Sequence, residues 1–590
     1  MNAIRTLLAC ILAAPALAGG GRWFPAEDWR ETPDECASPR AKKGGTLRFN
    51  GSSAPKSLNA YVDNNAYTMM TFELMYSGLV GVDARTLDFV PDLASRWHVS
   101  DDGAVFTFEM NPRAKWSDGV PVTAEDVKWT FDTVMSEKSE TGPWKVQLGY
   151  FESPVVEPGG RIRFSKKPGS APDWRDLMNC GRFPVLPRHA LEGRDFNKAS
   201  FLGMPVSGPY RLSRVAEQIE TEFSRVEGWW CADSPSCMGL FNFDRIVMRY
   251  YVDNENAFEA LKKRAIDVYP VYSARIMAEG TRAEKFARNW MLKRRVANQK
   301  PTGFQGFAMN MRRSPFDDVR VRKAMAHLVD RETMNRTMMS GEYFLLRSYY
   351  SDLYDDARPC GNELVRYDPS AARALLEEAG WRRRPEDGKL WKDGRRFVFT
   401  FLSRGASEDK FLSMFSHALE ECGIEMKIDR KDFAGWMRDM DEFNFDMTWA
   451  SWGSSIFKSP EFMWLSSEAD RKGSNNITGF KSAEVDAIIK AEKSMLRMKD
   501  REDAYRRIDA LVAEQVPYVL LWQVRETRLL YWNKFGMPDS VLTRHGDESC
   551  VLSCWWYDED RAEELERAMS AGRCLPGVPE RASFVPGGAR

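Results

Sequence analysis

A strand–helix–strand pattern in the second half of the chain constrains the fold most. FVFTFLS (397–403) predicts a buried strand, the amphipathic segment that ends at Glu421 predicts a helix, and IEMKIDR (424–430) predicts another strand. Strands joined through a helix run parallel, and helices cover both faces of a parallel sheet. The pattern therefore predicts an α/β domain.

Neighbouring segments extend this domain. GFAMN (306–310) predicts a strand, and DDVRVRKAMAHLVD (317–330) predicts an amphipathic helix. A further helix is opened by Asp368 with a proline after it and is closed by Gly380. FDMTWASW (445–452) is apolar on both faces, as expected for another strand buried in the same sheet.

The first half of the chain has a different pattern. Residues 46–110 are rich in alternating segments, and an Asp-Gly turn precedes the strand that ends at Met110. Thr123 predicts a helix N-cap, with Asp126 three residues further on. We therefore expect a strand-rich part followed by a parallel α/β part.

Composition limits the function classes. With 590 residues the chain needs two or three domains, and its 84 basic and 85 acidic residues give a net charge of −1. That balance argues against a nucleic-acid partner, which would favour a basic surface. The 20 tryptophans are numerous, and exposed aromatic side chains recur in binding clefts.

The N-terminus predicts export. Residues 1–18 combine Arg5, an apolar run and a small-residue end before glycines, which is typical of a cleaved signal peptide. Cys10 lies inside this run and is discarded with it. No later segment has 18 consecutive apolar residues, so we expect a soluble exported protein, periplasmic in location.

Nine cysteines remain after cleavage, an odd number, so at least one is free. Export favours disulfides, and Cys231 with Cys237 can close a short loop. Cys422 ends a predicted amphipathic helix and is the best candidate for a buried thiol. Residues 564–590 turn polar and then rich in Pro and Gly, which predicts a surface tail tethered through Cys574.

Catalytic signatures are missing from the sequence. The five histidines form no metal-binding or nucleophile-activating spacing, and there is no phosphate-binding glycine loop. His545 with Cys550 and Cys554 matches no common zinc pattern. We therefore expect no enzyme activity, no cofactor and no metal, and the profile favours a ligand-capture protein.

Several separated motifs resemble those of one protein family and occur in the same order along the chain. FVPDLASRWHVSDDGAVFTFEMNPRAKWSDGVPVTAEDVKWTFD (89–132), SGPYRL (207–212) and YDPSAARALLEEAGW (367–381) are similar to family 5 solute-binding proteins of bacterial ABC importers. GYFESPVVEPGGRIRF (149–164) and SCWWYDEDRAEEL (553–565) resemble the YejA-type branch, which is associated with peptides, microcin C and muropeptides.

The resemblance implies an α/β, two-lobed periplasmic-binding-protein fold with a hinge and an extra subdomain in the first lobe. It places an inserted subdomain at 86–200, lobe II at 300–505, and lobe I at 40–85, 201–299 and 506–560. VPYVLLWQ (516–523) would then be a strand of lobe I.

The resemblance implies that the two lobes close about a hinge on a peptide-like solute. The closed protein then delivers this solute to a membrane permease with its ATPase. A monomer is expected, without nucleic acid. The alternatives are a muropeptide or another modified peptide or glycan as ligand, ligand sensing in place of transport, and, most remotely, a hydrolase. Nickel capture is disfavoured because no histidine cluster offers ligands.

The resemblance also suggests ligand contacts. In peptide-binding relatives, a tryptophan at the Trp452 position lines the cleft, and an aspartate three residues later captures the ligand's amino terminus. Ser455 occupies that second position, and Gly453–Phe457 contains no carboxylate. Either another acid takes this role, or the ligand has no free amine there. Asp446 looks structural.

A second set of candidates follows predicted strands of both lobes. An arginine among them could pair with a ligand carboxylate. Trp449 is expected in the core, and Trp229 and Trp230 in packing. The ligand-binding candidates are Trp452, Gly453, Ser454, Ser455, Asn59, Tyr61, Asn310, Arg312, Arg313, Asn475 and Asn476.

Overall fold

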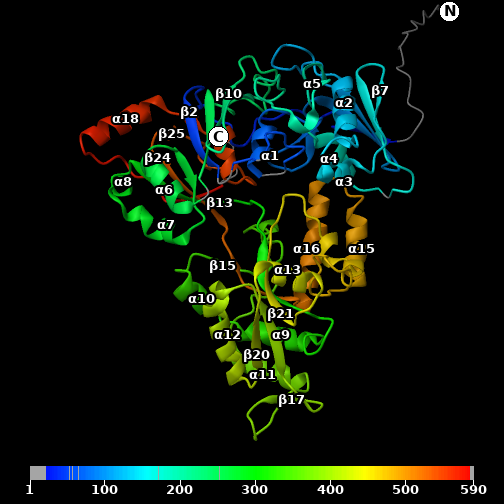
Figure 1. Cartoon of the computed structure of the whole chain (residues 1–590), viewed down its shortest axis with the longest axis vertical. Coiled ribbons are helices and arrows are strands. Elements are labelled where there is room, and N and C mark those ends of the chain that lie inside the picture. Colours follow the sequence, from blue (N-terminus) through cyan, green and yellow to red (C-terminus); the bar gives the residue numbers. More distant parts are fainter. Residues whose placement is uncertain are drawn as a thin grey trace, which may run out of the picture.

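A computed structural model describes residues 21–584 except 52, 53, 56, 64, 65, 171 and 252. The predicted signal peptide at 1–18 lies outside these residues. Figure 1 shows two bodies, an upper one containing both ends of the described chain and a lower one built from its middle. We call them lobe I and lobe II.

Lobe I is organised around an eight-stranded mixed sheet. Strand β2 is central and pairs in parallel with β11 and β12, while β24 pairs antiparallel with β12 and β13. In sheet order the strands are β27 (Arg581–Ser583), β13 (Met291–Ala297), β24 (Glu526–Trp532), β12 (Val268–Pro270), β2 (Thr46–Gly51), β11 (Arg245–Tyr250), β10 (Glu220–Arg225) and β9 (Tyr210–Ala216).

Helices of lobe I flank this sheet or connect its strands (Figure 1). They are α1 (Ala66–Glu73), α6 (Asn254–Lys262), α7 (Ala274–Ala278), α8 (Glu284–Ala287), α17 (Val551–Cys554) and α18 (Glu559–Ser570). Small two-stranded sheets pair β3 (Val80–Val82) with β4 (Phe89–Pro91) and β25 (Phe535–Gly536) with β26 (Trp556–Tyr557).

The inserted subdomain is a separate antiparallel sheet that shares its core with lobe I. Leu47 of β2 and Phe108 of β6 belong to one continuous cluster of buried side chains. Its strands are β1 (Gly21–Phe24), β5 (Ala94–Ser100), β6 (Val105–Met110), β8 (Arg161–Ser165) and β7 (Val155–Glu157), and its helices are α2 (Ala124–Met135), α3 (Gly142–Leu148), α4 (Arg175–Arg182) and α5 (Arg188–Leu191).

The predicted start of α2 is confirmed. The Thr123 side chain accepts from the Asp126 amide, and the Asp126 carboxylate accepts from the Thr123 amide. This reciprocal capping box satisfies two amides that the first helical turn leaves without a partner.

Lobe II contains the predicted parallel unit. β19 (Val398–Ser403), α12 (Asp409–Glu421) and β20 (Glu425–Arg430) form the strand–helix–strand unit, and β21 (Met447–Trp452) pairs in parallel with β19. β14 (Phe304–Met309) pairs antiparallel with β21 and with β22 (Tyr518–Leu520). The sheet is therefore mixed.

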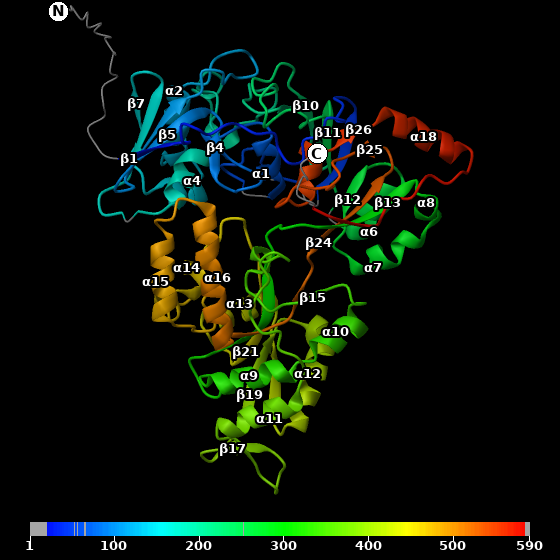
Figure 2. The same cartoon turned by 180° about the vertical axis from the view of Figure 1, so that it is seen from behind.

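Helices cover both faces of the lobe II sheet, as Figures 1 and 2 show. One face buries Phe307 and Trp449 against α9, α11 and α12, and the other buries Phe304 and Ala450 against α13, α15 and α16. The remaining elements include short hairpins. The bounds are α9 (Val319–Leu328), α10 (Arg331–Met338), α11 (Pro369–Glu378), α13 (Phe433–Asp441), α14 (Glu461–Trp464), α15 (Ala483–Glu492), α16 (Met498–Gln515), β15 (Phe344–Leu345), β16 (Arg382–Arg383), β17 (Leu390–Lys392), β18 (Arg395–Arg396) and β23 (Trp522–Gln523).

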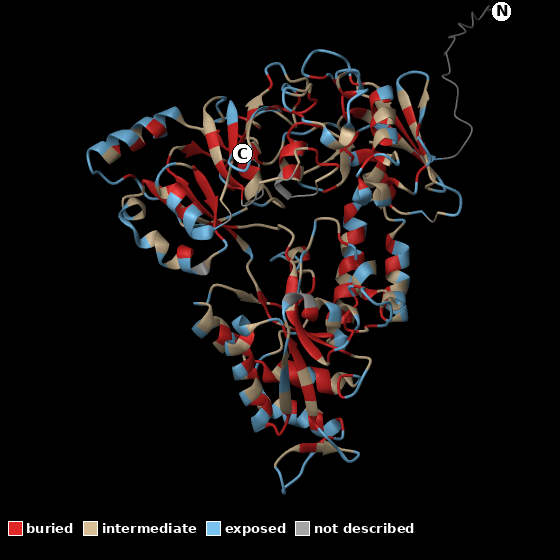
Figure 3. Ribbon diagram, viewed as in Figure 1, coloured by how far each residue is buried: buried red, intermediate tan, exposed pale blue. Residues whose placement is uncertain are grey.

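Buried side chains form separate cores in the two lobes (Figure 3). The chain passes from β13 to β14 through residues 298–303 and returns from β23 to β24 through residues 524–525. We call these two segments the crossings. Separate cores joined by two thin crossings suit a hinge.

Two sequence predictions are wrong. VPYVLLWQ is not a lobe I strand, because β22 within it pairs with β14 of lobe II, and α16 packs into the lobe II core. Its apolar run lacks a period that could assign it to either sheet. Residues 564–584 are not a free tail: they begin within α18, and β27 pairs in parallel with β13, while 585–590 lie outside the described residues.

Candidate functional site

A cavity of about 420 Å³ lies at the crossings. Lobe I, lobe II and both crossings contribute to its wall, so a ligand here would contact every part that moves when a hinge closes. Its lining residues are Pro270, Val271, Tyr272, Lys300, Pro301, Thr302, Gly303, Gln305, Tyr343, Gln523, Val524, Glu526, Thr527, Arg528 and Glu548.

The lobe II wall is formed where β14 begins beside the end of β21. Gln305 of the wall pairs with Ser451, one residue before Trp452. Its side-chain Oε1 accepts from the Trp449 indole at 3.0 Å, and its Nε2 donates to a backbone carbonyl. Gly303 packs directly on the Trp452 carbonyl, where an added Cβ would lie 2.0 Å from the oxygen. Only glycine allows this approach.

Charged groups of opposite sign face the cavity from the lobe I side. Lys300, in the first crossing, donates to Thr527 Oγ1 at 2.9 Å, and the Tyr272 hydroxyl donates to the Glu548 carboxylate. Burial lowers the pKa of Lys300 and raises the pKa of Glu548. Both groups therefore pay a desolvation cost that a bound counter-charge would reduce.

A charge cluster joins the lobes beside the cavity. Arg295 of β13 and Arg528 of β24 both donate to Glu342, which precedes β15 of lobe II, at 3.1 and 3.0 Å. The hydrogen bond from Arg295 holds the pKa of Glu342 below its usual range. This contact ties the lobes together at the crossings.

A second contact between lobes lies away from the crossings. There, α4 of the inserted subdomain meets α15 and α16 of lobe II, as both views show. The Trp174 indole donates to Glu492 at 2.6 Å, and the Trp174 amide donates to the carbonyl of Lys493 at 2.7 Å. Arg501 lies 3.9 Å above the Trp174 ring, and Phe457 packs beside it. We call this group the far contact.

Trp452 lies at the end of β21, half-buried, and its indole donates to the Tyr518 hydroxyl at 3.1 Å. Gly453 and Ser455 are exposed. Ser454 accepts from Lys458 at 2.7 Å, and the Ser455 hydroxyl donates to the Phe457 carbonyl. The loop therefore connects the edge of the cavity wall to the far contact.

Asn59 and Tyr61 are packed inside lobe I. Asn59 is fully buried, donates to the Phe196 carbonyl at 2.8 Å and accepts from the Tyr61 amide at 3.0 Å. The Tyr61 hydroxyl donates to the Pro184 carbonyl. Both predicted ligand contacts thus use their polar atoms within lobe I.

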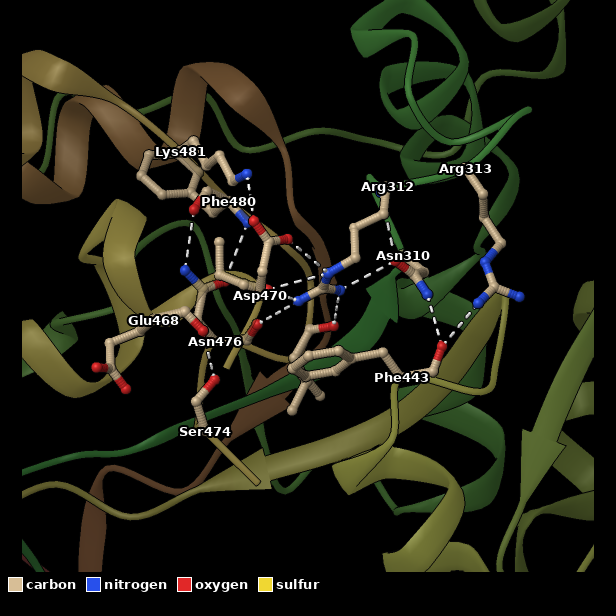
Figure 4. A network of polar contacts seen from close by, with 12 residues as sticks. Asn310, Arg312, Arg313, Phe443, Glu468, Asp470, Ser474, Asn476, Phe480 and Lys481 are labelled. Atoms are coloured by element: carbon tan, nitrogen blue, oxygen red, sulfur yellow. Dashed lines mark hydrogen bonds and ion pairs between the residues drawn. The ribbon is translucent and has the colours of Figure 1, made fainter. Parts of the chain in front are cut away.

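Asn310, Arg312 and Arg313 follow the other end of β14, because Phe304 pairs with Trp452 while Met309 pairs with Met447. Figure 4 shows their surroundings. The Arg312 guanidinium donates to three backbone carbonyls and to Asn310, and it lies 3.7 Å from the Phe443 ring centroid. The structure therefore does not bring these residues to the cavity.

Asn475 and Asn476 belong to the same part of lobe II. Asn476 is 1 % exposed and donates to the Leu465 and Phe480 carbonyls, while Asn475 is exposed. Asp446, predicted to be structural, accepts from the Thr400 amide at 2.8 Å. These side chains stabilise the loops below the sheet.

Other predicted residues have packing roles. Trp449 is buried in the lobe II core, and Trp229 and Trp230 both donate to the Ser207 carbonyl. Cys422 is a buried thiol whose pKa is raised by burial. Each of these expectations is confirmed.

The predicted Cys231–Cys237 pair is adjacent, with 2.8 Å between its sulfur atoms as thiols. Cys574 is an exposed free thiol, so it does not tether the C-terminal segment. The pairing of β27 with β13 holds that segment instead. The His545 ring contacts the Gln299 carbonyl, and no cluster suited to a metal ion occurs among the described residues.

A sequence profile decides the family. The profile of bacterial extracellular solute-binding proteins, family 5 Middle, matches residues 88–474. The chain belongs to the family 5 extracellular solute-binding proteins. Its curated relatives place it in the YejA branch of that family.

Relatives of this family 5 protein match over most of their length. YejA of Escherichia coli K12 is 26 % identical, covering 91 % of this chain and 92 % of its own. The peptidoglycan-binding protein YepA of Agrobacterium fabrum is 26 % identical, covering 87 % and 90 %. The open, unliganded form of the murein tripeptide-binding protein MppA shares the fold, with TM-score 0.68, 17 % identity and coverage of 87 % and 96 %.

Sequence reasoning missed three polar residues of the cavity. Tyr272, Lys300 and Glu548 lie in three segments far apart in sequence, and none stands in a recognisable motif. The pairing of β12 and β13 with β24 brings the segments of Tyr272 and Lys300 together. The Asn298 side chain donates to the carbonyls of Thr543 and Gly546, which places the loop before Glu548 beside the first crossing. As for membrane insertion, no helix in the described part of this family 5 protein is long and apolar enough to span a bilayer.

Proposed function

We propose that this protein is the solute-binding component of an ABC importer and captures a peptide-like ligand between its lobes. The observation that carries the proposal is the cavity of about 420 Å³ whose walls come from both lobes and both crossings. A peptide presents amides and charged groups, and this wall offers amides, hydroxyls and charges of both signs.

Related proteins support a peptide-like ligand. YepA is named for peptidoglycan binding, and MppA for a murein tripeptide. Ser455 favours a ligand of that class as a second candidate, because the loop from Gly453 to Phe457 supplies no carboxylate for an amino terminus. A muropeptide carries its amines elsewhere or blocked.

Ligand capture proceeds by hinge closure. The crossings permit rotation, while a ligand that touches both lobes favours the closed arrangement over the open one. An inner-membrane permease and its ATPase then receive the ligand from the closed protein, which acts as a monomer without catalytic chemistry.

The proposal includes location and boundaries. Residues 1–18 direct export to the periplasm and are removed. Lobe II runs from about residue 304 to 523, and lobe I returns with β24, so we revise the boundary at 505. The subdomain is assigned to 86–200. The ligand contacts that we retain are Trp452, Gly453, Ser454 and Ser455, joined by Tyr272, Lys300 and Glu548.

Ligand-dependent melting tests the function. Purified protein is refolded to remove carried-over ligand and heated with short peptides, muropeptides and a sugar panel. A ligand that binds only the folded state raises Tm. We expect a rise with peptides or muropeptides, and mass spectrometry of material that co-purifies with the protein identifies its natural ligand. A rise with sugars alone would refute the proposal.

A further inference from the structure

The Glu548 carboxylate is held at the cavity wall by its neighbours. Glu548 begins a short helical turn capped by Asp547, whose side chain accepts from the Ser549 amide at 2.9 Å. The Tyr272 hydroxyl donates to Oε1 of Glu548. Among the described residues, no other residue's side chain donates to Oε2. The backbone amide of Glu548 also donates to its own carboxylate. Tyr272 therefore orients Oε1, and Oε2, which has no side-chain donor in the described chain, can accept from a ligand.

Glu548 differs in this respect from the other acids beside the cavity. Glu526 lies 3.7 Å from Arg295 and 3.6 Å from Arg581, and Glu342 is bound by Arg295 and Arg528. In the described part of the chain, Glu548 has no ion pair with any lysine or arginine, although it lines the same cavity. Of these three acids in the described chain, Glu548 alone forms no ion pair.

Lys300 supplies a positive charge in the same cavity. Its charge lowers the pKa of Glu548, yet burial has the larger effect and raises it. Lys300 donates to Thr527, and the described residues contain no ion pair between Lys300 and Glu548. A cavity with one separated charge of each sign matches a zwitterion better than a neutral sugar or a dication.

We propose that Glu548 binds a primary ammonium group of the ligand, with Lys300 facing an anionic group of the same molecule. The proposal rests on the proposed function and makes it more specific. A carboxylate oriented by a tyrosine hydroxyl binds an ammonium through short charge-assisted hydrogen bonds. Glu548 thus supplies the acid that the loop at Ser455 lacks, from lobe I instead of lobe II.

Matched ligands and variants test this role by calorimetry. The ligands are Ala-Ala-Ala, its N-acetyl form, and N-acetyl-Ala-Ala-Lys, which moves the ammonium to a side chain. The proteins are the wild type, Glu548→Gln, and Glu137→Gln, an exposed acid of the inserted subdomain remote from the cavity. Glu548→Gln keeps the size of the side chain and removes its charge.

We expect Glu548→Gln to weaken binding of amine-bearing ligands by about 30-fold or more, because it removes one partner of a buried charge pair. Binding of a ligand without an ammonium changes less than threefold, and Glu137→Gln behaves as the wild type. Loss with Ala-Ala-Ala alone assigns the site to an amino terminus, and loss with the lysine peptide alone assigns it to a side-chain amine.

Other outcomes would refute the inference. If the wild type binds amine-bearing and acetylated peptides equally and Glu548→Gln does not alter this, Glu548 is not the ammonium anchor, while the proposed function stands. If the wild type binds no peptide or muropeptide, the proposed function fails and the inference with it. If Glu548→Gln does not fold, Glu548→Asp replaces it, because it keeps the charge and shortens the side chain. A weaker preference for the free amine over the acetylated peptide would then support the inference, and an unchanged preference would refute it.

Discussion

The Trp174 indole of the inserted subdomain donates to the Glu492 carboxylate of lobe II, a group with no solvent exposure. The Tyr505 hydroxyl donates to the same oxygen at 2.6 Å. Tyr505 lies in lobe II with Glu492, whereas Trp174 reaches the carboxylate from across the boundary, so the Trp174 hydrogen bond stabilises the arrangement in which the far contact is closed.

Trp174→Phe removes the indole donor and keeps a ring. Loss of one hydrogen bond to a buried charge costs about 1–3 kcal/mol, so we expect the closed state to lose population. Apparent ligand affinity then falls about tenfold or more, and small-angle scattering shows a more extended protein. Trp97→Phe is the matched control, since the Trp97 indole has no partner among the described residues. Unchanged affinity and scattering for Trp174→Phe would show that the far contact does not regulate closure.

Arg312→Met tests whether the network in Figure 4 is structural. The guanidinium is mostly buried, and its removal leaves several buried carbonyls without donors. We expect a loss of about 3–5 kcal/mol in stability to urea and unchanged ligand affinity in the folded fraction. Arg313→Met is the control: with a side chain 46 % exposed, it should cost less than about 1 kcal/mol. A loss of ligand affinity with unchanged stability would indicate that Arg312 contacts the ligand.

Trp452→Ala tests the cavity edge. An aromatic anchor truncated at a binding site costs about 1–3 kcal/mol of affinity, measured by calorimetry with the ligand found by mass spectrometry. Trp391→Ala, in a hairpin of lobe II away from the crossings, is expected to bind normally. Equal affinities for the two variants would place Trp452 in packing alone.

Asp92 predicts a pH dependence of stability. It faces a lobe I cavity of about 680 Å³, and burial raises its pKa to about 7, against a weaker opposing hydrogen bond from Ser77. Since the folded value exceeds the unfolded one of 3.8, ionisation of Asp92 opposes folding. This penalty is full above pH 7, decreases as pH falls through 7 and disappears below the unfolded value.

Asp92→Asn removes that penalty. We expect it to stabilise the protein by about 1–3 kcal/mol at pH 8.5 and to give no gain at pH 4. Urea unfolding at both pH values measures the difference. An equal effect at the two pH values would contradict a raised pKa.

Cys231 and Cys237 are predicted to form a disulfide in the exported protein. Intact mass should be two hydrogens below the fully reduced value, and peptide mapping should join these two residues. Replacing both by serine should cost about 2 kcal/mol, since the bond closes a short loop. Full alkylation of both thiols without reductant would contradict the pairing.

Local patterns predicted local structure well. The Thr123 cap, the parallel unit around α12 and the buried Trp449 each depend on periodicity or on a few adjacent residues. The cavity depends on pairing between strands more than 200 residues apart, which no local pattern contains. Likewise, Arg312 follows a strand as a ligand-binding arginine would, but antiparallel pairing of β14 places it at the opposite end from Trp452.

The position of β24 has a consequence for biosynthesis. β24 separates β12 from β13 in the lobe I sheet, yet it follows all of lobe II in the chain. Every strand of the lobe II sheet is therefore synthesised before the first domain can be completed. The nascent chain carries a half-built sheet with open edges while its middle portion folds, and such edges invite aggregation. Lobe I therefore cannot complete its sheet until the segment that follows lobe II is present.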